Sequence, residues 1–378
     1  MEENLLSAFD YAIDTANSAV FDALAKDFAS FSRDDKETLL IRTCVRAPSL
    51  GFVQHVLGYG YSLDYKGDDG ATLLHYAAGS EHAEIIRHFI KEGLDVNAKD
   101  NDGLTPLCYA AQYAGSADVL KALLDAGADA SVTDAGGETL LITAAGRNPT
   151  PEVTKFLLEQ GFDTEERDND GFTAVLNAAL WQSNEDVIAL LVDAGADISA
   201  KTNDGSTMLH LAARNESLSV VRYISSAFST WDVDNDGFST LRAALVGAQS
   251  ADVIKLFLRK AQFEHLEAAC FNKNPDILEA LLQSGYDVNA ADSDGVTALM
   301  TAAQYNTNPA VIRMLRYYNA VWNNADDKGR NALHHAAANS DSAIYEWMLT
   351  DDDFKTLAAH EDADGNTPAY YREHQEEF

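Results

Sequence analysis

Apolar residues along the chain fall into pairs of short segments that recur at a nearly constant interval. The first segment of a pair is rich in Leu and Ala, as in TLLHYAA at 72–78. The second has apolar residues at i, i+3 and i+4, as in ADVLKALLDAG at 117–127. This spacing is typical of amphipathic helices, which bury one face and expose the other. The chain is therefore expected to be all-α and built from repeated helix pairs.

A polar phrase ending in glycine precedes most helix pairs and fixes the period. Two copies are DDGATLLHYAA at 68–78 and NDGLTPLCYAA at 101–111. The successive glycines of this phrase, which are separated by 33, 34, 34 and 34 residues, are Gly70, Gly103, Gly137, Gly171 and Gly205. Self-similarity at this period marks stacked supersecondary units. Asp-Gly favours a tight turn, so each unit is expected to carry a projecting, hairpin-like finger.

Each unit also contains signals for the ends of its helices. Threonines such as Thr105 precede the first helix, where a hydroxyl can cap the free backbone N–H groups. Glycine follows the second helix at most units, where a left-handed residue commonly ends a helix. Asn319, the next most tolerant type, stands there in one unit. Turn, helix, helix and glycine therefore complete the unit.

The full pattern, D-x-x-G-x-T-P-L-H-x-A-A followed by L-L-x-x-G-A-D-V-N-A, resembles the ankyrin repeat over about residues 33–378. The resemblance implies an ankyrin-repeat solenoid of stacked helix-turn-helix units with projecting β-hairpin-like fingers, whose concave face binds proteins. The family's histidine is kept at His75, His210 and His334. The resemblance implies that these histidines form hydrogen bonds between units.

The repeats divide the chain into three regions. Residues 1–32 are expected to form an N-terminal helical cap, residues 33–361 the repeat array, and residues 362–378 a C-terminal capping helix, because the end units of such arrays need a polar outer face. The first unit has Lys36 in place of the turn glycine, which predicts a less regular first finger. The unit at 262–285 keeps both helices but is expected to lack its finger.

Composition restricts the classes of partner. The chain has 27 Lys and Arg against 60 Asp and Glu, a formal net charge of −33, which repels phosphate backbones and anionic lipid. No stretch approaches the roughly 18 apolar residues of a membrane span. We therefore expect neither nucleic acid nor a membrane as partner. The acidic surface favours solubility, and it would also attract a basic protein or peptide.

The cysteines and the N-terminus bear on location. Cys44, Cys108 and Cys270 are odd in number and lack CxxC spacing, which argues against a disulfide framework and a zinc site. The N-terminal residues lack the basic region and continuous apolar run of a signal peptide. We expect a cytoplasmic protein, with a secreted effector as the alternative.

Motifs for catalysis are absent from the sequence. It contains no G-x-S-x-G elbow, no G-x-x-x-x-G-K-[ST] phosphate loop and no H-E-x-x-H pair. The segment DVDNDG at 232–237 matches the opening of a calcium-binding EF-hand loop, but Ala243 stands where the twelfth-position Glu is needed. We expect no enzymatic activity, no cofactor and no metal.

The positions that the repeat leaves free to vary carry residue types that are common in interfaces. Tyr, Trp and Arg follow several Ala pairs, and apolar residues follow several turn glycines. The candidate partner-binding residues are Leu104, Gln112, Tyr113, Arg147, Phe172, Trp181, Arg214, Phe238 and Tyr305. The turn aspartates expected to form an acidic ladder on the fingers are Asp102, Asp170, Asp204 and Asp236.

These patterns predict a monomeric scaffold that binds another protein, with basic and apolar anchor residues, on its concave face. Tyr113, Arg147 and Trp181 are spaced 34 residues apart, so they should align in one stripe, which Arg214 extends. The expected site has an apolar and cationic centre with an acidic border. The alternative is a structural or regulatory spacer module, or a secreted effector, without a dedicated concave-face ligand.

Overall fold

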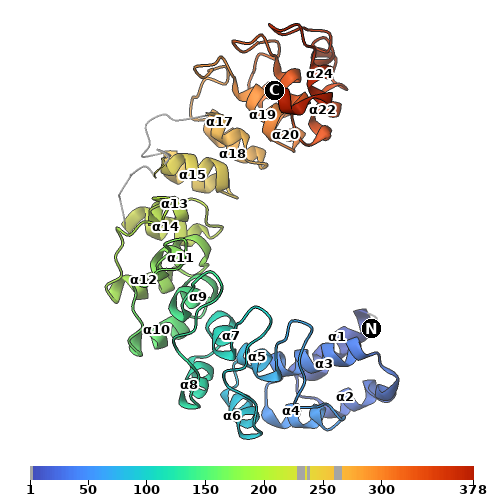
Figure 1. The fold of residues 1–378 in the computed structure, drawn as a ribbon, viewed down its shortest axis with the longest axis vertical. Helices are drawn as coiled ribbons and strands as arrows, with labels where there is room; N and C mark the ends of the chain where they lie inside the picture. The colour runs from blue at the N-terminus through green and yellow to red at the C-terminus, as the bar shows by residue number, and fades with distance from the viewer. Residues whose placement is uncertain (1–2, 228–234, 236–238, 259–265) are drawn as a thin grey trace. The chain divides into compact units, whose positions relative to one another are not determined.

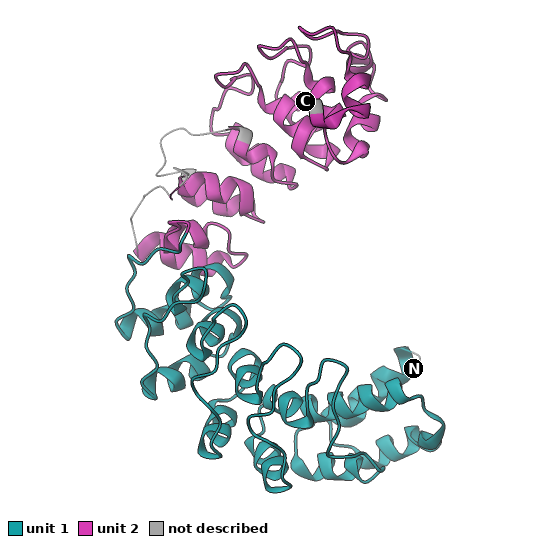
Figure 2. Ribbon diagram, in the orientation of Figure 1, with its two compact units in different colours: residues 1–203 teal, residues 204–378 magenta. Residues whose placement is uncertain are grey.

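The structure is a computed structural model that describes residues 3–227, 235, 239–258 and 266–378. It divides into two compact units, unit 1 at residues 1–203 and unit 2 at residues 204–378 (Figure 2). All regular structure in the described residues is helical, apart from isolated β-bridges such as the one between Lys66 and Thr72. The expected all-α class is confirmed. The division into two units was not predicted, because the repeat pattern continues through Gly205 without a break.

Unit 1 contains six successive helix pairs (Figure 1). The pairs are α1 (Glu3–Asp14) with α2 (Ser18–Leu24), α3 (Arg33–Arg46) with α4 (Leu50–Leu57), α5 (Leu73–Ala78) with α6 (Ala83–Lys91), α7 (Pro106–Tyr113) with α8 (Ala117–Asp125), α9 (Leu140–Arg147) with α10 (Pro151–Glu159), and α11 (Ala174–Trp181) with α12 (Glu185–Asp193). A short 3-10 turn, η1 (Phe28–Ser30), follows α2. From α3 onward the first helices of neighbouring pairs pack against each other, and so do the second helices. The first helices are called inner helices below, and the second ones outer helices.

Unit 2 continues the same alternation of inner and outer helices. Its helices are α13 (Met208–Ala212), α14 (Leu218–Ala227), α15 (Thr240–Gly247), α16 (Ala251–Leu258), α17 (Leu266–Cys270), α18 (Pro275–Leu282), α19 (Ala298–Tyr305), α20 (Pro309–Tyr317), α21 (Ala332–Ala337), α22 (Ser342–Met348), α23 (Asp352–Lys355), α24 (Pro368–Glu373) and the 3-10 turn η2 (Gln375–Glu377). The inner helix α17 packs against α15 and α19. The finger expected to be missing before α17 falls on residues 259–265, outside the described residues, so its absence stays a prediction.

Inner helices form where the sequence places a capping threonine before small apolar residues. Thr105 is the N-cap of α7, and Pro106 occupies the first helical position, where a missing N–H costs no hydrogen bond. Leu107, Ala110 and Ala111 of this helix are fully buried. Alanines at these positions let neighbouring inner helices pack closely. The buried leucine supplies most of the apolar area of the contact.

The fingers are hydrogen-bonded internally and to one another. In the finger before α7, Oδ1 of Asp100 accepts a bond from the backbone N–H of Leu104 at 2.8 Å. Gly103 has a φ of +82°, in the left-handed region that favours glycine. The backbone N–H of Asn101 donates to the carbonyl of Asp69 in the preceding finger at 2.8 Å. The Asp-Gly turns therefore have the hairpin-like form that the sequence predicts.

Two of the repeated histidines, His75 and His334, link their inner helix to the next finger. Nδ1 of His75 accepts a bond from the N–H of Thr72 at 3.0 Å, and Nε2 donates to the carbonyl of Leu104 at 3.1 Å. His334 donates in the same way to the carbonyl of Asn366 at 3.1 Å. Burial lowers the pKa of both His75 and His334. The histidines are packing residues, as the family resemblance implies.

Buried amide side chains join the ends of successive inner helices, a role that was not predicted from the repeat pattern. Nδ2 of Asn306 donates to the carbonyls of Cys270 at 2.7 Å and Asn272 at 2.8 Å, and its Oδ1 accepts a bond from the N–H of Asn308 at 2.8 Å. Amides that bond carbonyls of a preceding unit in this way also occur at Asn148, Gln182, Asn272 and Asn339. These amides bond carbonyls that the end of a helix leaves unpaired.

Residues 33–36 lie in a helix rather than in the less regular finger that was expected there. α3 begins at Arg33, and Ser32 caps it by accepting a bond from the N–H of Asp35 at 3.1 Å. Acidic residues in the first turn stabilise a helix N-terminus, and Asp34 and Asp35 occupy it. Because no glycine interrupts this segment, the helix replaces the finger.

Both terminal regions contain helices at the expected places. In the N-terminal region, α1 is joined to α3 by an ion pair in which Nε of Arg46 donates to Oδ1 of Asp14 at 2.8 Å. Phe9 and Phe21 are fully buried there. In the C-terminal region, α24 packs against α21. The role of residues 1–32 and 362–378 as caps stays a prediction.

Candidate functional site

Three candidate residues occupy the same place on successive inner helices of unit 1. Tyr113, Arg147 and Trp181 are the last residues of α7, α9 and α11. α9 packs against both of its neighbours, so the three residues follow one edge of the inner-helix face. Tyr113 is 57% exposed and Trp181 is 65% exposed. Their placement agrees with the repeat spacing, and their role in binding stays a prediction.

A groove of about 670 Å³ opens beside Trp181. Its walls come from the end of α9, from α11 and from the finger that precedes α11. The candidate residues that line it are Arg147, Asp170, Phe172 and Trp181. Other residues of its wall include Glu138, Gly146, Asp168, Asn177 and Leu180. The structure therefore gathers four candidates, from two successive units, around one groove.

An ion pair changes the charge that the groove was expected to have. The guanidinium of Arg147 lies 2.9 Å from Oε1 of Glu138. Burial raises the pKa of the Glu138 carboxyl. Arg147 is thus neutralised by its own chain, while Asp168 and Asp170 remain on the wall. The groove wall therefore combines one ion pair with two further carboxylates, and the cationic centre expected from the sequence stays a prediction.

The remaining candidates of unit 1 lie outside the groove wall. Leu104 is half-buried, and its carbonyl accepts the bond from His75. Gln112 is half-buried beside Tyr113, and Asp102 is exposed near the tip of its finger. The bond to its carbonyl involves the backbone alone, so a binding role for the Leu104 side chain stays a prediction. The structure adds no further contact that points to binding by Gln112 or Asp102.

The candidates of unit 2 have separate surroundings. Tyr305 is 55% exposed, and its ring centroid lies 5.1 Å from that of Phe271. Arg214 is exposed, and its Cγ lies 2.6 Å from the position that a Cβ on Gly247 would take. Asp204 is exposed. Phe238 and Asp236 lie outside the described residues. The extension of the stripe to Arg214, and of the acidic ladder to Asp204, stays a prediction.

Sequence reasoning missed Asp168 and Glu138, which shape the groove. Both occur in phrases that look like ordinary repeat turns. A signal exists in Gly146 and Asn177, since Asn177 stands where other units have Tyr109, His335 or Tyr371. Their effect is clear only in three dimensions, where a Cβ on Gly146 would lie 2.5 Å from the Asn177 amide.

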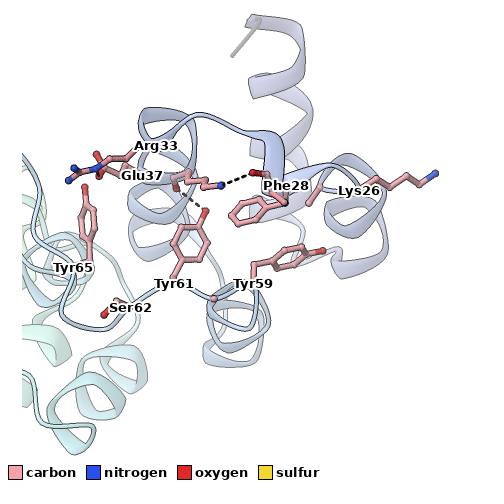
Figure 3. A pocket seen from close by; sticks show the side chains of 12 residues that line it. Lys26, Phe28, Arg33, Glu37, Tyr59, Tyr61, Ser62 and Tyr65 are labelled. Carbon is pink, nitrogen blue, oxygen red and sulfur yellow. Dashed lines mark hydrogen bonds and ion pairs between the residues drawn. The ribbon is translucent and has the colours of Figure 1, made fainter.

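A second hollow, of about 710 Å³, lies in the N-terminal part of unit 1 (Figure 3). Nζ of Lys36 donates to the carbonyl of Ala29 at 3.3 Å, and the Tyr61 hydroxyl donates to the carbonyl of Lys36 at 2.8 Å. Arg33 forms an ion pair with Glu37 at 2.7 Å. These polar groups bond to one another, which is typical of packing between helix ends.

In the described part of the chain, no group of three or more His, Cys, Asp or Glu side chains could hold a metal ion. The calcium-like segment at 232–237 lies almost wholly outside it. None of the described helices is long and apolar enough to cross a bilayer. No disulfide joins Cys44, Cys108 and Cys270, and burial raises the pKa of Cys44 to about 12.

Comparison with known proteins gives one family. One family model of ankyrin repeats matches residues 40–134, 114–202 and 266–358. A second ankyrin-repeat model matches residues 182–224. Among solved structures, the human ASB11 ankyrin repeat domain is similar, with 22% identity and a TM-score of 0.46 over 57% of this chain and 95% of that chain. A search of the curated proteins finds no match. Because the first family model alone matches more than half of the chain, this protein belongs to the ankyrin-repeat family.

Proposed function

We propose that the chain is a scaffold that binds one partner protein through the inner-helix face of unit 1, the concave face in this family. Ankyrin repeats are generally protein-protein interaction modules. The observation that carries the proposal is Trp181, which is 65% exposed at the edge of a groove of about 670 Å³. Large aromatic side chains beside such grooves commonly anchor interfaces.

The exposed indole supplies enough apolar area to dominate an interface. A Trp side chain can bury up to about 250 Å², and 65% of it is exposed here. Covering that part, at most roughly 160 Å², removes apolar area worth up to about 4 kcal/mol at ~25 cal/mol per Å², before the costs of association are subtracted. Phe172, which lines the same groove, extends the apolar surface. A partner would therefore place an apolar or planar group on this ring.

Charge supports a partner that carries basic residues. The chain has a formal net charge of −33, and the groove wall includes Asp168 and Asp170. Long-range attraction of this kind raises association rates, and its effect falls as salt increases. Nucleic acid would be repelled by the same field.

We also infer that the scaffold is non-enzymatic, monomeric and cytoplasmic. The three cysteines form no disulfide with one another, which supports the cytoplasmic location, because oxidising compartments favour disulfides. Light scattering coupled to size exclusion tests the monomer, for which a mass of 41.0 kDa is expected. A mass of twice that value would overturn it.

Differential capture tests the proposal. The full chain and its Trp181→Ala variant serve as baits in the native lysate, and captured proteins are compared by mass spectrometry. The proposal expects at least one protein that the parent retains and the variant loses. If both baits retain the same proteins in the same amounts, the site is elsewhere; if neither retains any, the spacer alternative is favoured.

A further inference from the structure

The first aspartate of several fingers receives a hydrogen bond from the inner helix that follows it. In each case the donor stands nine residues after the aspartate, and it bonds Oδ2 of the carboxylate. The pairs are Tyr109 with Asp100 at 2.9 Å, Tyr371 with Asp362 at 2.6 Å, and His335 with Asp326 at 3.2 Å. All three aspartates are buried, so the donor satisfies an acceptor that water does not reach.

Asp168 is the equivalent aspartate in the finger beside the groove, and it lacks this partner. Its Oδ1 accepts bonds from the N–H groups of Asp170 at 2.9 Å and Phe172 at 2.8 Å. Among the described residues no donor reaches Oδ2. Asp168 is only half-buried, and the open oxygen belongs to a residue of the groove wall.

The missing donor has a structural cause. The residue nine positions after Asp168 is Asn177, whose Nδ2 donates to the carbonyl of Ile142 in the preceding unit at 2.9 Å. Gly146 makes room for this arrangement, because a Cβ there would lie 2.5 Å from the Asn177 amide nitrogen. The side chain that could have bonded Asp168 is therefore committed to the preceding unit.

The groove also lacks a free cation of its own. Arg147 is paired with Glu138 at 2.9 Å, and the other charged residues of the wall are Asp168 and Asp170. The exposed indole of Trp181 completes the site. An open carboxylate oxygen, a planar aromatic ring and a net negative wall lie around one groove.

We propose that this groove binds an arginine side chain of the partner protein. The guanidinium donates to Oδ2 of Asp168 and lies against the Trp181 ring. Guanidinium is planar, bonds carboxylates through a fork of N–H donors and stacks on aromatic faces, whereas the lysine ammonium is a compact charge with a stronger hydration shell. The inference rests on the proposed protein-binding function, and it assigns the chemistry of the anchor.

The test uses small probes and therefore needs no identified partner. The full chain, labelled with ¹⁵N, is titrated with N-acetyl-arginine methylamide, and the indole N–H signal of Trp181 is followed by NMR after assignment with Trp181→Phe. The blocked citrulline is the matched control, because it keeps the planar shape and loses the charge. We expect the Trp181 signal to move with arginine, and binding of citrulline to be at least about tenfold weaker.

Two substitutions locate the contact. Asp168→Asn keeps an oxygen for the backbone bonds and removes the charge, so it should weaken binding of the arginine probe about tenfold. Asp134→Asn is the control, since Asp134 holds the same place in the preceding finger and accepts the Glu138 N–H at 2.8 Å. It should bind the probe like the parent. Circular dichroism checks that both variants are folded.

Three results would overturn the arginine anchor: no movement of the Trp181 signal, equal binding of arginine and citrulline, or an unchanged affinity in Asp168→Asn. These results are distinguishable from failure of the proposed function. If Trp181→Ala loses the partner while Asp168→Asn keeps it, the protein-binding face stands and the anchor is not arginine. If the probe binds but Trp181→Ala keeps the partner, the protein-binding face lies elsewhere.

Discussion

Replacing the buried Asn306 by alanine should destabilise unit 2 far more than the same change at Asn308. Asn306 is fully buried and makes three hydrogen bonds, at 2.7, 2.8 and 2.8 Å. At about 1 kcal/mol for each bond, the loss is about 3 kcal/mol, and it grows if the two freed carbonyls remain without water. Asn308 is the matched control, because it is half-exposed and makes bonds of 2.7 and 3.0 Å to Lys273 and Ala310. As a helix N-cap in contact with solvent, it should contribute about 1 kcal/mol.

Urea unfolding followed by far-UV circular dichroism measures both changes. With a slope of about 2 kcal/mol per molar urea, the Asn306→Ala transition should fall by about 1.5 M and the Asn308→Ala transition by about 0.5 M. Repeat arrays do not always unfold in one step, so tryptophan fluorescence is recorded as well. The transition that shifts should be the one reported by the unit 2 tryptophans, which are Trp231, Trp322 and Trp347. Equal shifts for the two variants would refute the view that buried amides hold successive inner helices together.

Two further predictions follow from the fingers and the histidines. Gly103→Ala and Gly171→Ala both place a side chain at a φ above +80°, which lowers the free energy of unfolding by about 1–2 kcal/mol. Gly171→Ala should lower it further, because its Cβ would also lie 2.8 Å from the backbone nitrogen of Asn203. Equal urea midpoints for the two variants would count against the close contact between fingers. Burial lowers the pKa values of His75 and His334. Below a pH of about 6.5, the ordinary pKa of histidine, the unfolded chain therefore binds more protons than the folded chain does. The free energy of unfolding should fall as pH drops from 7.5 to 5.5. Urea titrations at the two pH values measure this difference in the free energy of unfolding. His75→Gln should make the difference smaller. If the difference is the same in the variant, His75 does not remain neutral in the folded chain.

The sequence predicts the repeat architecture well because its signals are local. Thr105 caps a helix, Gly103 permits a left-handed turn, and the period of 33 or 34 residues brings equivalent residues of neighbouring units together. The family matches confirm that architecture over most of the chain. The stripe of Tyr113, Arg147 and Trp181 follows from the same period, since each ends an inner helix.

The features that could not be predicted depend on side-chain contacts that the repeat pattern does not encode. The pairing of Arg147 with Glu138 removes a charge that the sequence presents as available. The orientation of Asn177 toward Ile142 depends on the absence of a side chain at Gly146. The helix at residues 33–36 was missed for a different reason, because the repeat pattern was extended to a unit whose capping residues favour a helix.

The affinity of a captured partner for Trp181→Ala tests the central claim most directly. Tyr317→Ala is the matched control, because Tyr317 is an aromatic residue with 78% exposure at the end of the outer helix α20. Lys155→Ala is a second control on the outer helix α10. By calorimetry, Trp181→Ala should lose at least about 2 kcal/mol, roughly thirtyfold in Kd, and Tyr113→Ala a smaller amount, while both controls bind like the parent. Equal Kd values for the parent and Trp181→Ala would contradict the claim that the inner-helix face of unit 1 is the binding surface.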